Sequence, residues 1–172
     1  MNVNHFFLII AFVLGAIFIF FKPLDLKFDN PNEVAQLELE TFTVYELTKE
    51  GLKSITKGSR GERYENRNEA NDIDFTDNSK QFSQNMKADF GRQQDNKVML
   101  NGNVRYKRED GLIFKSQEAA YNQKSTVVTT KGDFNMYYGD NWVEGTKLYY
   151  DATKRQSKSD NVTGLYDITK EQ

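Results

Sequence analysis

Beyond Gln36, apolar and polar residues alternate with a period of two, and helical periodicity is nearly absent. The clearest segments are "VMLNGNVRYK" at 98–107 and "VVTTKGDFNMYY" at 127–138. In each, apolar residues and glycine share one face, while polar residues fill most of the other. Turn sequences rich in Gly and Asp follow at 108–111 and 138–141. This pattern predicts an all-β domain of many short strands.

The alternating segments repeat about every thirty residues. The triplet Gly-Asn-Val at 102–104 recurs as Gly-Asp-Phe at 132–134, with weaker copies at 71–73 and 160–162. One unit of this kind cannot bury its own apolar face and must stack on its neighbours. We therefore expect repeated antiparallel β-units in one sheet that folds over itself, with an apolar inner face and a charged outer face.

Gly102 and Gly132 occupy the same place in two of the repeats, at the start of the matching strands. A glycine there indicates a bulge or a close backbone approach more than a ligand contact. Both glycines are expected to be structural.

The N-terminus carries an unbroken apolar run from Phe6 to Phe21. As a helix it would be roughly 24 Å long, somewhat short of the hydrocarbon core of a bilayer. No small-residue cleavage site follows the run, and no Lys or Arg precedes it. We therefore expect an uncleaved, single-pass transmembrane anchor over 1–22, a linker over 23–36 and a β-domain over 37–172.

Composition and motifs exclude several function classes. The net charge is −2 with both signs mixed, so no basic surface for nucleic acid is expected. The chain has no cysteine, and its one histidine, His5, lies beside the apolar run. The segment 72–83 superficially suggests a calcium loop, but it has Asp77 at the sixth position and Ser83 at the twelfth. We expect no enzyme, no cofactor and no metal site.

Both ends of the β-domain read as terminal strands with an open edge. "ELETFTVYEL" at 38–47 shifts its alternation at Thr41, as at a bulge. Near the C-terminus, one face carries the expected partner-edge residues Val162, Gly164, Tyr166 and Ile168. An open edge at each end of a stack is what head-to-tail strand addition requires.

Three segments, together with the apolar run, carry a resemblance to a known family. They are "LETFTVYELTKEGLKSITKGSRGERY" at 39–64, "LNGNVRYKREDGLIFKSQEAAYN" at 100–122 and "TTKGDFNMYYGDNWVEGTKLYYD" at 129–151. These resemble the LptC family, the inner-membrane components of the lipopolysaccharide export bridge. The periplasmic bridge protein LptA is similar but has a cleaved signal peptide, so the anchor favours LptC.

The resemblance implies a twisted β-jellyroll whose hydrophobic groove holds the acyl chains of lipopolysaccharide. It implies that the N-terminal edge and the anchor dock on the inner-membrane Lpt ABC transporter complex, where ATP is hydrolysed. The C-terminal edge would dock on an LptA-like periplasmic protein. The chain would then be a single-pass protein of the inner membrane with its β-domain in the periplasm. Gly132 matches the glycine of the family's repeat, where a side chain is expected not to fit.

Strand alternation, rather than the resemblance, selects the residues expected to face the interior and contact lipid. They are Phe42, Val44, Ile73, Phe75, Met86, Phe90, Val104, Tyr106, Phe134, Met136, Leu148 and Tyr150. For each, a place in a closed core without lipid contact is an equal alternative. The competing function is therefore a membrane-tethered adaptor or scaffold whose closed β-core binds only proteins. An enzyme with an unrecognised Ser-Lys or carboxylate pair is a weaker third hypothesis.

Overall fold

The computed structural model describes residues 34–167, which lie in the second of the two units into which the chain divides, 1–31 and 32–172. The predicted anchor and most of the predicted linker lie outside the described residues. Within 34–167, no helix has the length and apolar character needed to cross a membrane.

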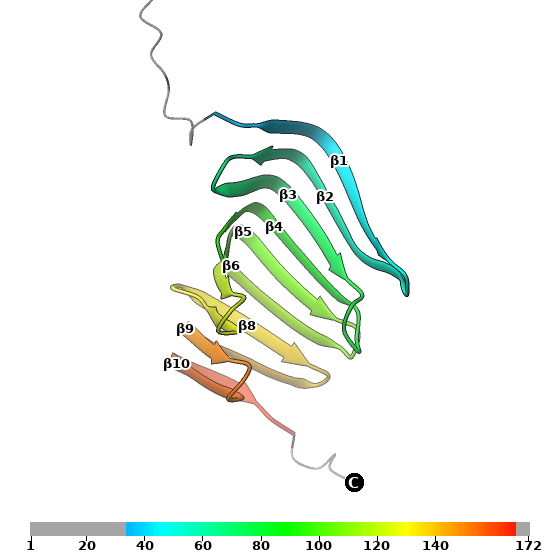
Figure 1. The fold of residues 1–172 in the computed structure, drawn as a ribbon. Coiled ribbons are helices and arrows are strands. Elements are labelled where there is room, and N and C mark those ends of the chain that lie inside the picture. The colour runs from blue at the N-terminus through cyan, green and yellow to red at the C-terminus, as the bar shows by residue number, and fades with distance from the viewer. Residues whose placement is uncertain (1–33, 168–172) are drawn as a thin grey trace, which may run out of the picture. The chain divides into compact units, whose positions relative to one another are not determined.

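Within residues 34–167, ten strands form one antiparallel sheet (Figure 1). They are β1 (Leu37–Thr48), β2 (Gly51–Arg63), β3 (Arg67–Asp77), β4 (Gln84–Gln94), β5 (Lys97–Arg108), β6 (Leu112–Asn122), β7 (Val127–Thr129), β8 (Asp133–Tyr138), β9 (Asn141–Asp151) and β10 (Gln156–Leu165). The strands follow one another in chain order, and the short strands β7 and β8 together fill one place between β6 and β9. The predicted all-β antiparallel fold is confirmed for this part of the chain.

Residues with left-handed backbone interrupt several long strands near their middle. They are Thr41 in β1, Asp72 in β3, Asn103 in β5, Lys147 in β9 and Asn161 in β10. Asp72, Asn103 and Asn161 are the central residues of three of the repeated triplets. The fourth triplet, 132–134, falls where β7 ends and β8 begins. The sequence repeat therefore marks where β3, β5 and β10 bend and where β7 gives way to β8, because bulges and breaks change the direction of a strand.

Gly102 and Gly132 differ in their surroundings, although the repeat equates them. Gly102 lies within β5 rather than at its start, has a φ of 75°, and a Cβ there would collide with the Asp89 side chain. Gly132 precedes β8, its φ lies outside the left-handed region, and a Cβ there would meet nothing within 4 Å. The expectation that a side chain does not fit at Gly132 is therefore wrong on steric grounds.

The interior is packed in two small clusters. Ala88, Leu100 and Val104 form one, and Phe114, Phe134 and Leu148 form the other. Half-buried apolar residues surround both clusters, and none of the large side chains of residues 34–167 is fully buried. The inner face, defined here as the face of these two clusters, is thus only partly filled by the protein's own side chains.

Candidate functional site

A single line of cross-strand neighbours runs across the inner face from one edge of the sheet to the other. This line, the apolar row, consists of Val44, Thr56, Phe75, Met86, Tyr106, Phe114, Met136, Val143 and Gly164. Each member lies opposite the next on a neighbouring strand, so the row spans roughly 40 Å along the sheet. Five of the twelve predicted interior residues belong to it.

The apolar row is not sealed from solvent. Phe114 is buried in a core cluster, but Phe75, Met86, Tyr106 and Met136 are only half-buried. At the β1 end of the row, Val44 is 49% exposed. The row therefore presents apolar surface along most of its length, which an apolar ligand could cover.

Other predicted interior residues lie in the core or against glycines. Val104, Phe134 and Leu148 are buried, and Phe134 is only 2% exposed. The Ile73 side chain lies against Gly91 of the neighbouring strand, and the Phe42 ring lies against Gly58 and Gly61. For these five residues, packing within the protein accounts for the apolar side chain.

Two predicted interior residues are placed differently from the rest. Phe90 lies opposite the exposed Asn71 and Asn101, whereas the next residue, Gly91, lies opposite the buried Leu100. Successive strand residues point to opposite faces, so Phe90 is on the outer face and its inward prediction is wrong. Tyr150 is in register with Val128, beyond the bend of the sheet, and is 39% exposed.

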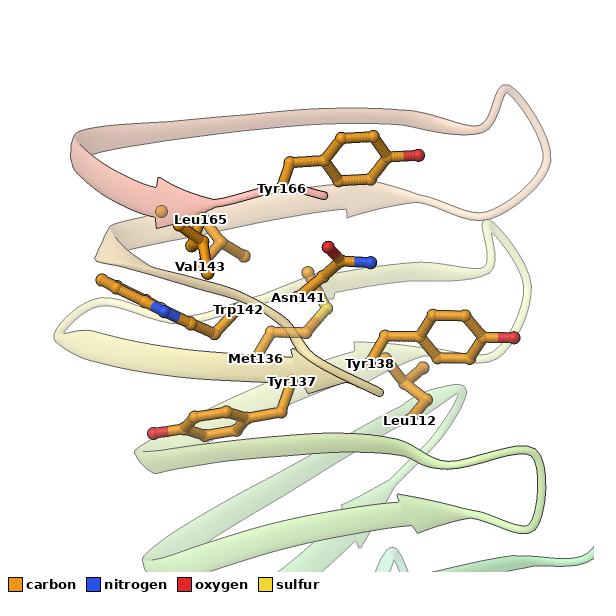
Figure 2. A pocket seen from close by; sticks show the side chains of 10 residues that line it. Leu112, Met136, Tyr137, Tyr138, Asn141, Trp142, Val143, Leu165 and Tyr166 are labelled. Carbon is orange, nitrogen blue, oxygen red and sulfur yellow. The ribbon is translucent and has the colours of Figure 1, made fainter. Parts of the chain in front are cut away.

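A pocket of about 450 Å³, the end pocket, adjoins the apolar row near its β10 end. Figure 2 shows the ten residues that line it: Leu112, Met136, Tyr137, Tyr138, Asn141, Trp142, Val143, Gly164, Leu165 and Tyr166. Tyr138 and Tyr166 project to one side of the strands, and Tyr137 and Trp142 project to the other. Leu112, Met136 and Val143 lie on the face of the apolar row, whereas Tyr137 and Trp142 lie on the opposite face, so the lining draws on both faces at this end of the sheet.

The C-terminal side of the end pocket is formed by a segment that a hydrogen bond holds in place. The backbone N–H of Asp167 donates to Oδ1 of Asn141 at 2.7 Å. This bond holds the residues after β10 against the start of β9, where Tyr166 contributes to the pocket lining. Gly164 has no side chain to fill the pocket, and a Cβ there would lie 2.8 Å from the carbonyl oxygen of Trp142.

Both edges of the sheet are open within the described residues. β1 pairs only with β2, and β10 pairs only with β9. Apolar side chains are exposed at each edge, including Leu47 at 73% in β1 and Val162 at 54% in β10. Of the predicted partner-edge residues, Val162 and Gly164 belong to β10, Tyr166 follows it, and Ile168 lies outside the described residues.

A charged pair lies at the rim of the inner face, beside the end pocket. Arg108 donates Nε and Nη2 to the two carboxylate oxygens of Asp110, at 2.8 and 2.7 Å. Arg108 lies two residues from Tyr106 of the apolar row, on the same face of β5. Burial raises the pKa of the Tyr106 phenol, and the nearby Arg108 guanidinium acts against that rise.

The outer face beside the apolar row is charged. Lys57, Asp74, Lys87, Arg105 and Lys115 are cross-strand neighbours there. Burial acts to raise the pKa of Asp74, but Lys87 at 2.7 Å and a hydrogen bond from Asn85 leave the pKa below its ordinary value. Among residues 34–167, no three His, Cys, Asp or Glu side chains are placed to hold a metal.

The sequence interpretation missed three members of the apolar row, Thr56, Phe114 and Val143, and also missed the Arg108–Asp110 pair. Phe114 and Val143 lie in the quoted repeat segments, where the same period-two alternation would have selected them. The Arg108–Asp110 pair had no comparable signal, because its "REDG" segment is also an ordinary turn sequence.

The comparisons with known proteins agree with this architecture. A family model described as "Lipopolysaccharide-assembly, LptC-related" matches residues 7–167, which is nearly the whole chain. No curated protein matches the chain. The family model covers nearly all of the apolar run, the ten described strands and the end pocket, and it implies a part in lipopolysaccharide export. The chain therefore belongs to the LptC-related family of lipopolysaccharide-assembly proteins.

Proposed function

We propose that this protein binds the acyl chains of lipopolysaccharide along its inner face and passes them toward the β10 edge. The apolar row carries this proposal, because it continues across nine strands without a charged residue. Each exposed CH₂ of an acyl chain costs about 0.8 kcal/mol in water. A line of similar, half-open apolar sites offers such a chain a path without a deep trap.

The two open edges support the assignment of one partner protein to each end of the sheet. The β1 edge, with the N-terminal anchor, would dock on the inner-membrane Lpt ABC transporter complex, and the transporter would supply the energy of ATP hydrolysis. The β10 edge would accept a strand of an LptA-like periplasmic protein, because its outer side has no neighbour among the described strands. In this arrangement residues 1–22 cross the inner membrane and the β-domain lies in the periplasm. No catalytic step or cofactor is assigned to this chain.

The competing function is a tethered adaptor that binds proteins only. Val104, Phe134 and Leu148 favour it, because they are buried by the protein itself and leave no room for lipid at those positions. The half-buried members of the apolar row favour lipid contact instead. The interior thus contains closed core positions and half-open positions of the apolar row, and we assign lipid contact to the apolar row.

Photo-crosslinking with the full-length chain in nanodiscs tests the proposal. A photoreactive amino acid is placed at Tyr106, or separately at its neighbour Arg105 on the outer face, and lipopolysaccharide is added before irradiation. We expect a lipid adduct at Tyr106 and none at Arg105. Adducts at neither position, from protein that retains its β-sheet circular dichroism, would contradict lipid binding and favour the adaptor.

A further inference from the structure

The Arg108–Asp110 pair is a bidentate ion pair beside the apolar interior. Both carboxylate oxygens of Asp110 accept from Arg108, and Oδ1 also accepts from the backbone N–H of Leu112 at 3.4 Å. Leu112 lines the end pocket. The pair is therefore joined directly to the wall of the pocket.

The turn that carries Arg108 is fixed by further hydrogen bonds. Gly111 donates its backbone N–H to the carbonyl oxygen of Arg108 at 3.0 Å. Glu109 exchanges two bonds with Ser83 of the preceding turn: its backbone N–H donates at 2.9 Å, and its carboxylate accepts at 3.0 Å. A guanidinium held on so rigid a turn loses little conformational freedom when it binds a ligand.

Arg108 has donor capacity beyond the bonds to Asp110. A guanidinium has five N–H donors, of which Asp110 uses two. The Tyr106 hydroxyl also hydrogen-bonds to the guanidinium. The Arg108 side chain is still 35% exposed, so N–H groups beyond these contacts can reach a ligand at the rim. Tyr138, which lines the end pocket, is among the groups that raise the pKa of Arg108, after Asp110.

We propose that Arg108 binds a phosphate group of an amphiphile whose acyl chain occupies the end pocket. This inference rests on the proposed function and adds a polar contact to it. The end pocket takes the apolar part of the ligand, and the guanidinium at the rim takes the anion. Arginine is well suited to that role, since its planar N–H groups bind phosphate oxygens in pairs. Asp110 holds the guanidinium in place and competes with the phosphate for it.

The test measures how strongly the full-length chain in phosphatidylcholine nanodiscs prefers phosphorylated lipid. Lipid A with two phosphates and fully dephosphorylated lipid A are supplied at increasing mole fractions, and a photoreactive amino acid at Met136 reports occupancy. We expect half-saturation at an about tenfold lower mole fraction for the phosphorylated lipid, as one charge-assisted contact provides. Arg108→Gln should remove this preference without weakening binding of the dephosphorylated lipid.

Three variants separate phosphate binding from a structural role. Asp110→Asn should strengthen the preference for phosphorylated lipid, because it removes the competing carboxylate and keeps the shape. Arg108→Lys should retain part of the preference. Arg105→Gln, which removes a cation from the outer face of the same strand, should leave it unchanged.

The outcomes that overturn the inference are distinct from failure of the proposed function. Equal losses of both lipids in Arg108→Gln, or no change in either, would exclude phosphate binding by Arg108 without contradicting acyl-chain binding by the unmodified protein. Displacement of both lipids by excess inorganic phosphate would also overturn it, since the dephosphorylated lipid has no phosphate with which free phosphate could compete at Arg108. Absence of any Met136 adduct in the unmodified protein overturns the proposed function together with this inference.

Discussion

The ring of Phe42 in β1 covers Gly61 in β2: a Cβ on Gly61 would lie 2.8 Å from Cε1 of Phe42, and the three nearest atoms all belong to that ring. Gly58, nearer the bend, is covered by the same ring. β1 has no second neighbour in the described sheet, so this contact adds to the β1–β2 pairing that holds the edge strand. The two glycines are needed for the ring to approach the backbone this closely.

Gly61→Ala should therefore destabilise the domain by about 1–3 kcal/mol, because the added methyl group displaces a packed ring. The measurement is denaturant unfolding of the full-length chain in detergent, with amide hydrogen exchange to show whether β1 is the part that loosens. In a Phe42→Ala background the same substitution should cost almost nothing, since the ring it collides with is absent. Additive costs in the double variant would contradict the proposed contact.

Gly102→Ala and Gly132→Ala should differ in their free energies of unfolding, although both positions occupy the same place in the repeat. At Gly102 the left-handed backbone alone costs a non-glycine residue about 1–2 kcal/mol, and Asp89 must also move. At Gly132 neither obstacle exists, and alanine should change the free energy of unfolding by less than about 1 kcal/mol, in the stabilising direction. Unfolding of both variants under identical conditions checks the difference, and equal effects would contradict it.

Phe134→Ala and Phe75→Ala should distinguish a position in the closed core from a position in the apolar row. Phe134 is 2% exposed, so its truncation should cost about 3–5 kcal/mol of stability. Phe75 is half-buried in the apolar row, so its truncation should cost clearly less. If the apolar row carries lipid, Phe75→Ala should nevertheless reduce the Tyr106 adduct with lipopolysaccharide in folded protein. An undiminished adduct would remove Phe75 from the path.

Local patterns predict the strands and turns well because period-two alternation and glycine-rich turns depend on adjacent residues only. The segment around Val104 and Tyr106 faces inward as alternation predicts. The alternation fails where a strand bends: Ala88 and Gly91 both face the interior, which leaves Phe90 outside. The sequence repeat indicates where a strand bends. It does not indicate which side chains change face at the bend, because that depends on the neighbouring strands.

The candidate site was only partly predictable for a related reason. Met86, Tyr106 and Met136 could be assigned to the inner face one strand at a time. That they lie in a single row with Phe114 depends on the register between strands, which pairs Tyr106 with Phe114 and Phe114 with Met136. Register is fixed by hairpin geometry and packing over the whole sheet, so the continuous row emerges only from the structure.

Leu165→Lys should weaken strand addition at the β10 edge without unfolding the domain. Leu165 is 56% exposed at the end of β10, and a lysine on an edge strand opposes pairing with a further strand. The measurement is binding of a purified LptA-like bridge protein to the full-length chain. Leu47→Lys, at the exposed β1 edge, is the matched control and should leave that binding unchanged. Equal losses in both variants would point to a general effect on the sheet rather than to the edge.

The Arg108–Asp110 pair should make stability depend on pH at the acidic end. The hydrogen bonds from Arg108 are the main reason why the pKa of Asp110 lies below its ordinary value of 3.8. A carboxyl group with a lowered pKa contributes stability above its unfolded pKa and loses that contribution as the pH falls through its folded pKa. The unmodified protein should therefore be more stable than Asp110→Asn at neutral pH, and the difference should close as the pH falls below 3.8. Denaturant midpoints of both proteins across the acidic range measure the gap. A gap that stays constant to the lowest pH would show that the ionised carboxylate of Asp110 contributes nothing to it.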